Sequence, residues 1–371
     1  MEINNLEMIS FRNHRKTYID FDSGLTIIWG ENGSGKTSIL EAIHSLSYGK
    51  SFRTNNKKDL IKKGSDFFFI KGSFKNTENF NNTVSLSQDI KGNKKIQIDN
   101  KIIKKRKDLF GLNNVVVFSP EEEGITKGTP LFRRNYFDRI FSICSYEYLS
   151  SLLLYNKTIK QRNSILKNSN SLFDKEKELE IWDKPFCVNG LSLWKKREKL
   201  MNSFINLFLK TVIDFDKDLL LNIKYELKIK TKKEFFKKTK ENRPVDLVKK
   251  YTSFGPHKDD IVFLWDNQKI KNHGSQGEHK IFLALLKITE YIFLSNKTRK
   301  TPIFLIDDMF ANLDKERSKK LLRFIENIKN KNKEKSQTII TTTNIVNIKE
   351  NGFFIEFDDI KKHHLVKNGT T

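Results

Sequence analysis

The sequence predicts an α/β protein in which a mixed β N-terminal lobe and the C-terminal part form one core, with a helical second lobe inserted between them. Three observations lead to this prediction. Short β-type runs crowd the first third of the chain, helical spacing dominates the middle, and two strongly apolar runs flank a helix near the end. We therefore expect three segments, residues 1–125, 126–250 and 251–371.

The expected strands are apolar or β-branched runs separated by clusters of Asn, Gly, Lys or Asp, which suit turns. In the N-terminal segment these runs cover residues 3–10, 17–21, 25–29, 67–74, 83–87, 95–103 and 115–118. Strand-like runs return at residues 221–231, 261–265, 303–306 and 338–342.

Helical spacing begins with a stripe of apolar residues from Phe137 to Leu152 and continues in a second stripe from Leu193 to Thr211. Further helices are expected over residues 278–294 and 315–328. The helical segment is too short to form a long coiled coil.

The most informative motif directly follows the apolar run at residues 25–29. It is a complete P-loop with the pattern G-x-x-x-x-G-K-[ST], made of Gly30, Glu31, Asn32, Gly33, Ser34, Gly35, Lys36, Thr37 and Ser38. The glycines allow backbone N–H groups to face a polyphosphate, and the helix that follows adds its N-terminal dipole. Lys36 supplies a positive charge for the β- and γ-phosphates, and the Thr37 hydroxyl is a Mg²⁺ ligand. The motif predicts nucleotide binding.

A second motif is the apolar strand at residues 303–306, which ends in Asp307 and Asp308. In P-loop proteins such a strand lies beside the P-loop, so its first carboxylate comes near the metal. We expect Asp307 to be the Mg²⁺-side ligand, and Asp308 to orient or deprotonate the attacking water.

Two more elements complete an ordered series. Ser275 and Gly277 form a Ser/Gly turn that opens a helix, and Asp314 follows the acidic pair within Asn-Leu-Asp. The order P-loop, Ser-x-Gly helix, Asp-Asp strand and Leu-Asp is that of ABC-type ATPases. In these proteins the Ser/Gly turn of one subunit completes the phosphate site of another.

Composition limits the functional classes. The chain of 371 residues carries 69 basic and 45 acidic side chains, a net charge of +24 that attracts polyanions such as nucleic acids. Lys, Asn, Ile and Phe are all abundant, so part of this charge can reflect an AT-rich genome. Membrane-spanning length, a secretory signal and metal-ligand cysteine spacing are all lacking, which predicts a cytoplasmic protein.

The motifs together resemble the RecF family of DNA-repair ATPases, which have an ABC-type head of the SMC kind. The similarity extends along nearly the whole chain. Its elements are Phe11-Arg12-Asn13, the P-loop with Leu40-Glu41-Ala42-Ile43, Ser51-Phe52-Arg53-Thr54, Phe118-Ser119-Pro120-Glu121, Arg133-Arg134-Asn135-Tyr136-Phe137-Asp138, Gly255-Pro256-His257-Lys258-Asp259-Asp260, Gly274-Ser275-Gln276-Gly277, Asp307-Asp308, Leu313-Asp314 with Arg317, and Thr341-Thr342-Thr343.

The resemblance implies a weak DNA-dependent ATPase that uses ATP and Mg²⁺ and forms an ATP-dependent homodimer. Two ATP molecules would lie between the P-loop of one subunit and the Ser275 turn of the other. The family acts in DNA replication, recombination and the SOS response, on duplex DNA at single-strand/double-strand junctions. RecR and RecO are its partners in loading RecA. Arg12 either reaches a nucleotide phosphate in cis or is an ordinary surface arginine, and no membrane association is implied.

Some positions depart from the family pattern or leave their role open. Glu278 and His279 stand where the family commonly has glutamine. This difference leaves open how strong the contact of the Ser275 turn with the second subunit is. Glu121 is a weak candidate for water or metal positioning. His257 has a structural role or senses nucleotide, and Thr342 or Thr343 can sense the γ-phosphate or simply favour a strand.

Two alternative functions share part of the pattern. A transporter ATPase subunit shares the P-loop and the Ser/Gly turn, but the net charge and the Gly-Pro-His-Lys-Asp-Asp element disfavour it. A chromosome-organising SMC-like ATPase needs a long coiled coil, for which the helical segment has no room.

Overall fold

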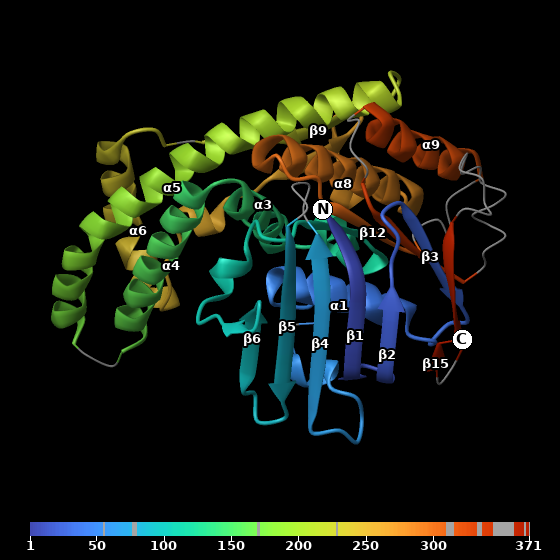
Figure 1. The fold of residues 1–371 in the computed structure, drawn as a ribbon. Helices are drawn as coiled ribbons and strands as arrows, with labels where there is room; N and C mark the ends of the chain where they lie inside the picture. Colours follow the sequence, from blue (N-terminus) through green and yellow to red (C-terminus); the bar gives the residue numbers. More distant parts are fainter. Residues whose placement is uncertain are drawn as a thin grey trace. The chain divides into compact units, whose positions relative to one another are not determined.

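The computed structural model describes residues 1–54, 56–75, 80–168, 171–227, 229–308, 315–331, 336–343, 360–366 and 369–370. The chain divides into two compact units (Figure 1). Unit 1 comprises Met1–Glu123 and Ser275–Thr371, and unit 2 comprises Gly124–Gly274. The expected α/β core with a helical insertion is confirmed.

The first sheet of unit 1 is largely parallel and has the order β15-β14-β3-β13-β12-β8. Its strands are β3 (Leu25–Gly30), β8 (Val115–Phe118), β12 (Ile303–Asp307), β13 (Thr338–Thr342), β14 (Lys361–Val366) and the antiparallel edge strand β15 (Gly369–Thr370). All residues of β8, β12 and β13 are buried, as expected for parallel strands covered on both faces. Strand β13 lies between β3 and β12, so the Asp307 strand is one strand removed from the P-loop strand.

The second sheet of unit 1 is antiparallel, with the order β2-β1-β4-β5-β6-β7. It contains β1 (Glu2–Phe11), β2 (His14–Asp20), β4 (Phe67–Lys75), β5 (Asn81–Asp89), β6 (Lys94–Ile98) and β7 (Lys101–Ile102). Burial alternates along β5, which indicates one face toward the core and one toward solvent.

Helix α1 (Lys36–Tyr48) contacts strands of both sheets and is buried at every residue except Thr37. A helix that is buried on all sides needs small or apolar residues on every face, and α1 supplies Ile, Leu, Ala and Ser. The other helical elements of unit 1 are η1 (Lys57–Leu60), η2 (Arg106–Leu109), η3 (Pro120–Glu123), α8 (Gln276–Thr298) and α9 (Lys315–Lys331).

Unit 2 is mainly helical. Its helices are α2 (Gly124–Lys127), α3 (Pro130–Cys144), α4 (Tyr146–Lys167), α5 (Leu172–Phe215), α6 (Lys232–Lys249), η4 (Pro256–Lys258) and α7 (Ile270–His273). The apolar stripe expected over residues 137–152 belongs to two helices rather than one. The chain turns at Ser145, whose hydroxyl accepts a hydrogen bond from the Tyr148 N–H and caps α4.

The boundary of unit 2 lies beyond residue 250, the limit expected from the sequence. Strand β10 (Val262–Trp265) pairs with β9 (Leu221–Lys224) and with β11 (Gln268–Lys269), so the chain up to Gly274 remains with the helices. Long-range pairing of this kind leaves no signal in local composition.

The Gly-Pro-His-Lys-Asp-Asp segment is part of the buried polar network of unit 2. The Asp259 carboxylate accepts hydrogen bonds from the Trp194 indole at 2.8 Å and the Tyr225 hydroxyl at 2.8 Å, and it pairs with the buried Arg197. His257 lies between the Tyr155 hydroxyl at 2.6 Å and the Thr252 carbonyl at 2.8 Å. Of the two roles left open for His257, these contacts support the structural one.

Among the helices in the described part of the chain, none is long and apolar enough to cross a membrane.

Candidate functional site

The P-loop occupies the turn between β3 and α1, at the edge where the parallel strands end. Gly30, Gly33 and Gly35 have positive φ angles of 152°, 82° and 104°, so the loop needs residues without a Cβ. A Cβ at Gly35 would also meet the imidazole of His14. The Lys36 ammonium donates to the carbonyls of Gly30 and Glu31, each at 2.8 Å, and is thereby held over the loop.

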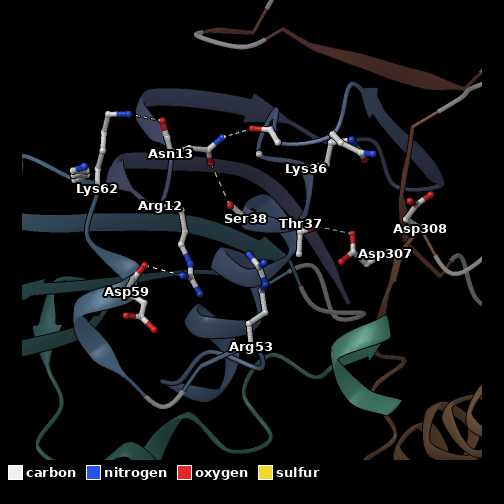
Figure 2. A pocket seen from close by; sticks show the side chains of 14 residues that line it. Arg12, Asn13, Lys36, Thr37, Ser38, Arg53, Asp59, Lys62, Asp307 and Asp308 are labelled. Atoms are coloured by element: carbon white, nitrogen blue, oxygen red, sulfur yellow. Dashed lines mark hydrogen bonds between the residues drawn. The ribbon is translucent and has the colours of Figure 1, made fainter. Parts of the chain in front are cut away.

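Thr37 and Asp307, the two expected Mg²⁺ ligands, lie together (Figure 2). The Thr37 hydroxyl donates to the Asp307 carboxylate at 2.9 Å, and the Thr341 hydroxyl donates to the same oxygen at 2.6 Å. The sequence had singled out Thr342 and Thr343; the structure adds Thr341. Burial raises the pKa of Asp307, while the two hydroxyl donors oppose this shift. A hydroxyl beside a buried carboxylate is a hard-oxygen donor pair that fits Mg²⁺.

Asp308 follows at the end of β12 and lines the same pocket as Lys36. Its φ of 43° lies in the left-handed region, and its N–H donates to the Thr341 carbonyl at 3.1 Å. Burial raises its pKa, and the charge of Lys36 acts in the opposite direction. Its carboxylate is therefore a better proton acceptor than an exposed aspartate.

The β1–β2 turn supports the P-loop from outside, a contact that was not predicted from the sequence. The Asn13 amide donates to the Gly33 carbonyl at 3.0 Å, and the Ser38 hydroxyl donates to Asn13 at 3.4 Å (Figure 2). The His14 ring lies 3.1 Å from the Gly35 carbonyl, and burial lowers its pKa. Asn13 belongs to the Phe11-Arg12-Asn13 motif, but its partners are visible only in the fold.

Glu41 organises the two arginines of the pocket. Its side chain has no exposed surface, and Arg12 donates to it from Nε at 2.8 Å and from Nη2 at 2.7 Å, while Nη1 of Arg12 donates to the Asp59 carbonyl at 2.8 Å. Arg53 lies 3.5 Å from the same carboxylate and 3.0 Å from Glu121, and the Ser51 hydroxyl also donates to Glu41. Glu121 is thus paired with Arg53. Arg12 is fixed in place rather than being a mobile surface arginine.

These elements enclose a cavity of about 550 Å³ in unit 1 (Figure 2). Its lining residues are Arg12, Asn13, Asn32, Gly33, Gly35, Lys36, Thr37, Ser38, Arg53, Asp59, Lys62, Lys63, Asp307 and Asp308. Five of the fourteen are basic, which suits a polyphosphate. Lys62 and Lys63 were not anticipated from the sequence.

Ser275 and Gly277 are not among the residues that line this cavity. Ser275 is exposed and caps α8, with its hydroxyl 3.3 Å from the Glu278 N–H and the Glu278 carboxylate 2.7 Å from its own N–H. Glu278 therefore satisfies the N-terminal amide of this turn. Asp314 lies outside the described residues.

Comparison with known proteins identifies the family to which the chain is similar. The model of the RecF/RecN/SMC N-terminal domain matches residues 2–363. The DNA replication and repair protein RecF of Clostridium novyi is 33% identical over 377 residues, covering 100% of this chain and 99% of the relative. RecF of Leptospira interrogans serogroup Icterohaemorrhagiae serovar Lai is 33% identical over 373 residues, with coverage of 100% and 98%.

Solved structures give the same result. The recombination mediator protein RecF with ATP superposes with a TM-score of 0.85 at 26% identity, covering 100% of this chain and 96% of that one. An Smc head bound to the C-terminal winged-helix domain of ScpA has a TM-score of 0.54 at 18% identity, covering 94% and 92%, and shares the fold. The chain belongs to the RecF family, within the wider RecF/RecN/SMC group.

Proposed function

We propose that this protein is an ATP-binding mediator of recombinational DNA repair that binds duplex DNA as an ATP-dependent dimer. One observation carries the proposal: in a RecF-family chain, P-loop residues that include Lys36 and Thr37 line one cavity together with Asp307, which accepts from Thr37, and with Asp308. The names of the relatives, DNA replication and repair protein and recombination mediator protein, support the biological setting. We place this activity in the cytoplasm, as expected for DNA-repair proteins of this family.

Each residue of the site has a definable task in ATP hydrolysis. Lys36 and the P-loop amides hold the phosphates, and Arg12, held by Glu41, lines the same cavity. Thr37 and Asp307 would hold Mg²⁺, which supplies charge neutralisation and orientation of the phosphates when bound. Asp308, with its raised pKa, orients and deprotonates the attacking water.

A dimer is proposed because the Ser275 turn is exposed and lies outside the lining of the cavity in its own chain. Such a turn at a helix N-terminus suits the terminal phosphate of a nucleotide held by a second copy. The finer assignments are proposals as well: a preference for single-strand/double-strand junctions, stimulation of hydrolysis by DNA, and partnership with RecR and RecO.

The composite site is tested by comparing wild type with Lys36→Ala, Asp308→Asn and Asp59→Asn. Light scattering measures the mass, and phosphate release measures hydrolysis, with and without ATP, Mg²⁺ and duplex DNA. Asp308→Asn removes the proton acceptor and leaves the P-loop, so it should bind ATP, hydrolyse it at least about a hundredfold more slowly and accumulate as a dimer. Lys36→Ala should remain monomeric.

Asp59→Asn is the matched control, because Asp59 lines the same cavity on the Arg12 side. It should retain most of the turnover. If Asp308→Asn stays monomeric with ATP, the dimeric site is refuted. If Asp59→Asn loses as much activity as Asp308→Asn, the role assigned to Asp308 is wrong.

A further inference from the structure

The solvent face of α5 carries a row of lysines. Steps of three or four residues place ten positions on this face: Lys177, Ile181, Lys184, Val188, Ser192, Lys195, Lys199, Asn202, Asn206 and Lys210. Nine of the ten are exposed, and Ser192 is half-buried. We call this face the α5 lysine row.

The row is not explained by the basic composition of the chain. Helix α5 as a whole is nearly balanced, with eight basic and seven acidic residues. Between Lys177 and Lys210 the row holds five of the eight basic residues and none of the acidic ones. The exposed Asp174 precedes the row by one step, and the exposed Glu180 lies beside it, 3.4 Å from Arg243. Compositional drift would add lysine to all exposed faces alike, so the segregation indicates a constraint on this face.

The opposite face of α5 already has its packing partners. It buries residues such as Leu179, Phe186 and Leu193, and it packs against α4 and α6 (Figure 1). Its acidic Asp183 pairs with the buried Arg162. The lysine row therefore takes no part in the core of unit 2.

The basic run on α6 provides a contrast within the same unit. Lys232, Lys233, Lys237, Lys238 and Lys240 are all exposed. Steps of four and three place Lys233, Lys237 and Lys240 on one face of α6, whereas Lys232 and Lys238 point about 100° or more away from it, so the five lysines do not form one row. The exposed Glu234 and Glu241 lie among them, and Lys238 pairs with Glu241 at 3.1 Å. Density in the sequence is thus a poor guide to a continuous basic surface.

We propose that the α5 lysine row is a surface of this protein that binds the phosphate backbone of duplex DNA, an inference that rests on the proposed function. Along the axis of α5, which contains Pro185, the row from Lys177 to Lys210 covers about 50 Å, the length of roughly 15 base pairs. Lysine heads bind phosphates as point charges, and the amides of Asn202 and Asn206 can donate to phosphate oxygens. The row carries no arginine for bidentate base contacts, so binding is independent of sequence.

The test replaces all five lysines of the row by glutamine in the full chain and measures binding to a 30-base-pair duplex with ATP. The matched control replaces Lys232, Lys233, Lys237, Lys238 and Lys240 by glutamine, which changes the net charge by the same amount in the same unit. A third variant carries arginine at the five row positions. Circular dichroism and ATP-dependent dimerisation verify folding.

Each lysine–phosphate contact contributes about 0.9 to the slope of log K against log salt concentration. In the glutamine row variant the magnitude of this slope should therefore decrease by about 3 to 5. Its affinity for the duplex near 0.1 M salt should be at least about tenfold lower than that of wild type. The control should keep most of the slope, and the arginine variant should bind as wild type does.

Three results would overturn the assignment. An unchanged slope in the row variant would show that these lysines do not contact DNA phosphates, and would indicate another partner such as an acidic protein. Equal losses in row and control variants would indicate a diffuse field. Loss of binding in the arginine variant would exclude simple phosphate contacts. If wild type itself does not bind duplex DNA, the proposed function fails first.

Discussion

The Arg12–Glu41 pair makes an asymmetric prediction about stability. Glu41 has no exposed surface, while 19% of the Arg12 side chain is exposed. Arg12→Ala leaves a buried carboxylate whose remaining partners are Arg53 at 3.5 Å and the Ser51 hydroxyl. Removal of one member of a buried ion pair costs about 3–5 kcal/mol, and because Arg53 remains we expect about 3 kcal/mol of lost unfolding free energy.

Glu41→Gln should cost less, about 1–2 kcal/mol. The amide keeps one acceptor oxygen, and the two arginines reach solvent through the cavity. In the double variant no buried charge remains, so the combined loss should fall short of the sum by about 1–2 kcal/mol. Arg15→Ala, at an exposed position three residues away, is the control and should change stability by less than about 0.5 kcal/mol.

Unfolding in urea is monitored by pulsed hydrogen exchange in peptides of β1 and α1, which belong to unit 1. A probe within this unit is needed because a chain with two units need not unfold in one transition. The reasoning is refuted if Glu41→Gln costs as much as Arg12→Ala. Strict additivity of the two single losses would equally contradict a shared buried charge.

Two further predictions concern a backbone position and a half-buried histidine. Gly35→Ala should weaken binding of a fluorescent ATP analogue at least about tenfold, because its Cβ would meet His14. Gly64→Ala is the control and should leave the affinity unchanged, since Gly64 has a similar φ of 84° but open space around its Cβ. Equal affinities of the two variants would contradict the effect of the His14 contact. Burial lowers the pKa of His257 to about 4, so below pH 6.5 the native state binds fewer protons than the unfolded state does. Stability of unit 2 should therefore fall by about 2 kcal/mol from pH 7 to pH 5 in urea titrations, and His257→Gln should remove that component; an unchanged pH dependence would contradict it.

The sequence by itself predicted the candidate site residues that belong to contiguous motifs. Gly30 to Ser38 can be read as a phosphate loop because the chemistry needs glycines, a lysine and a hydroxyl at fixed spacing along one turn. The strand that precedes Asp308 and ends in Asp307 could also be predicted from the sequence, because a parallel strand buried on both faces must be continuously apolar.

Only the tertiary structure decided which distant residues meet. The bracing of the P-loop by Asn13, the clustering of Arg12 and Arg53 on Glu41, and the pairing of β9 with β10 all join segments far apart in the chain. Such contacts depend on strand register and helix packing, and neither leaves a local signal in composition or spacing. For the same reason, the segregation of charge on α5 became meaningful only after the fold had shown which of its faces is exposed.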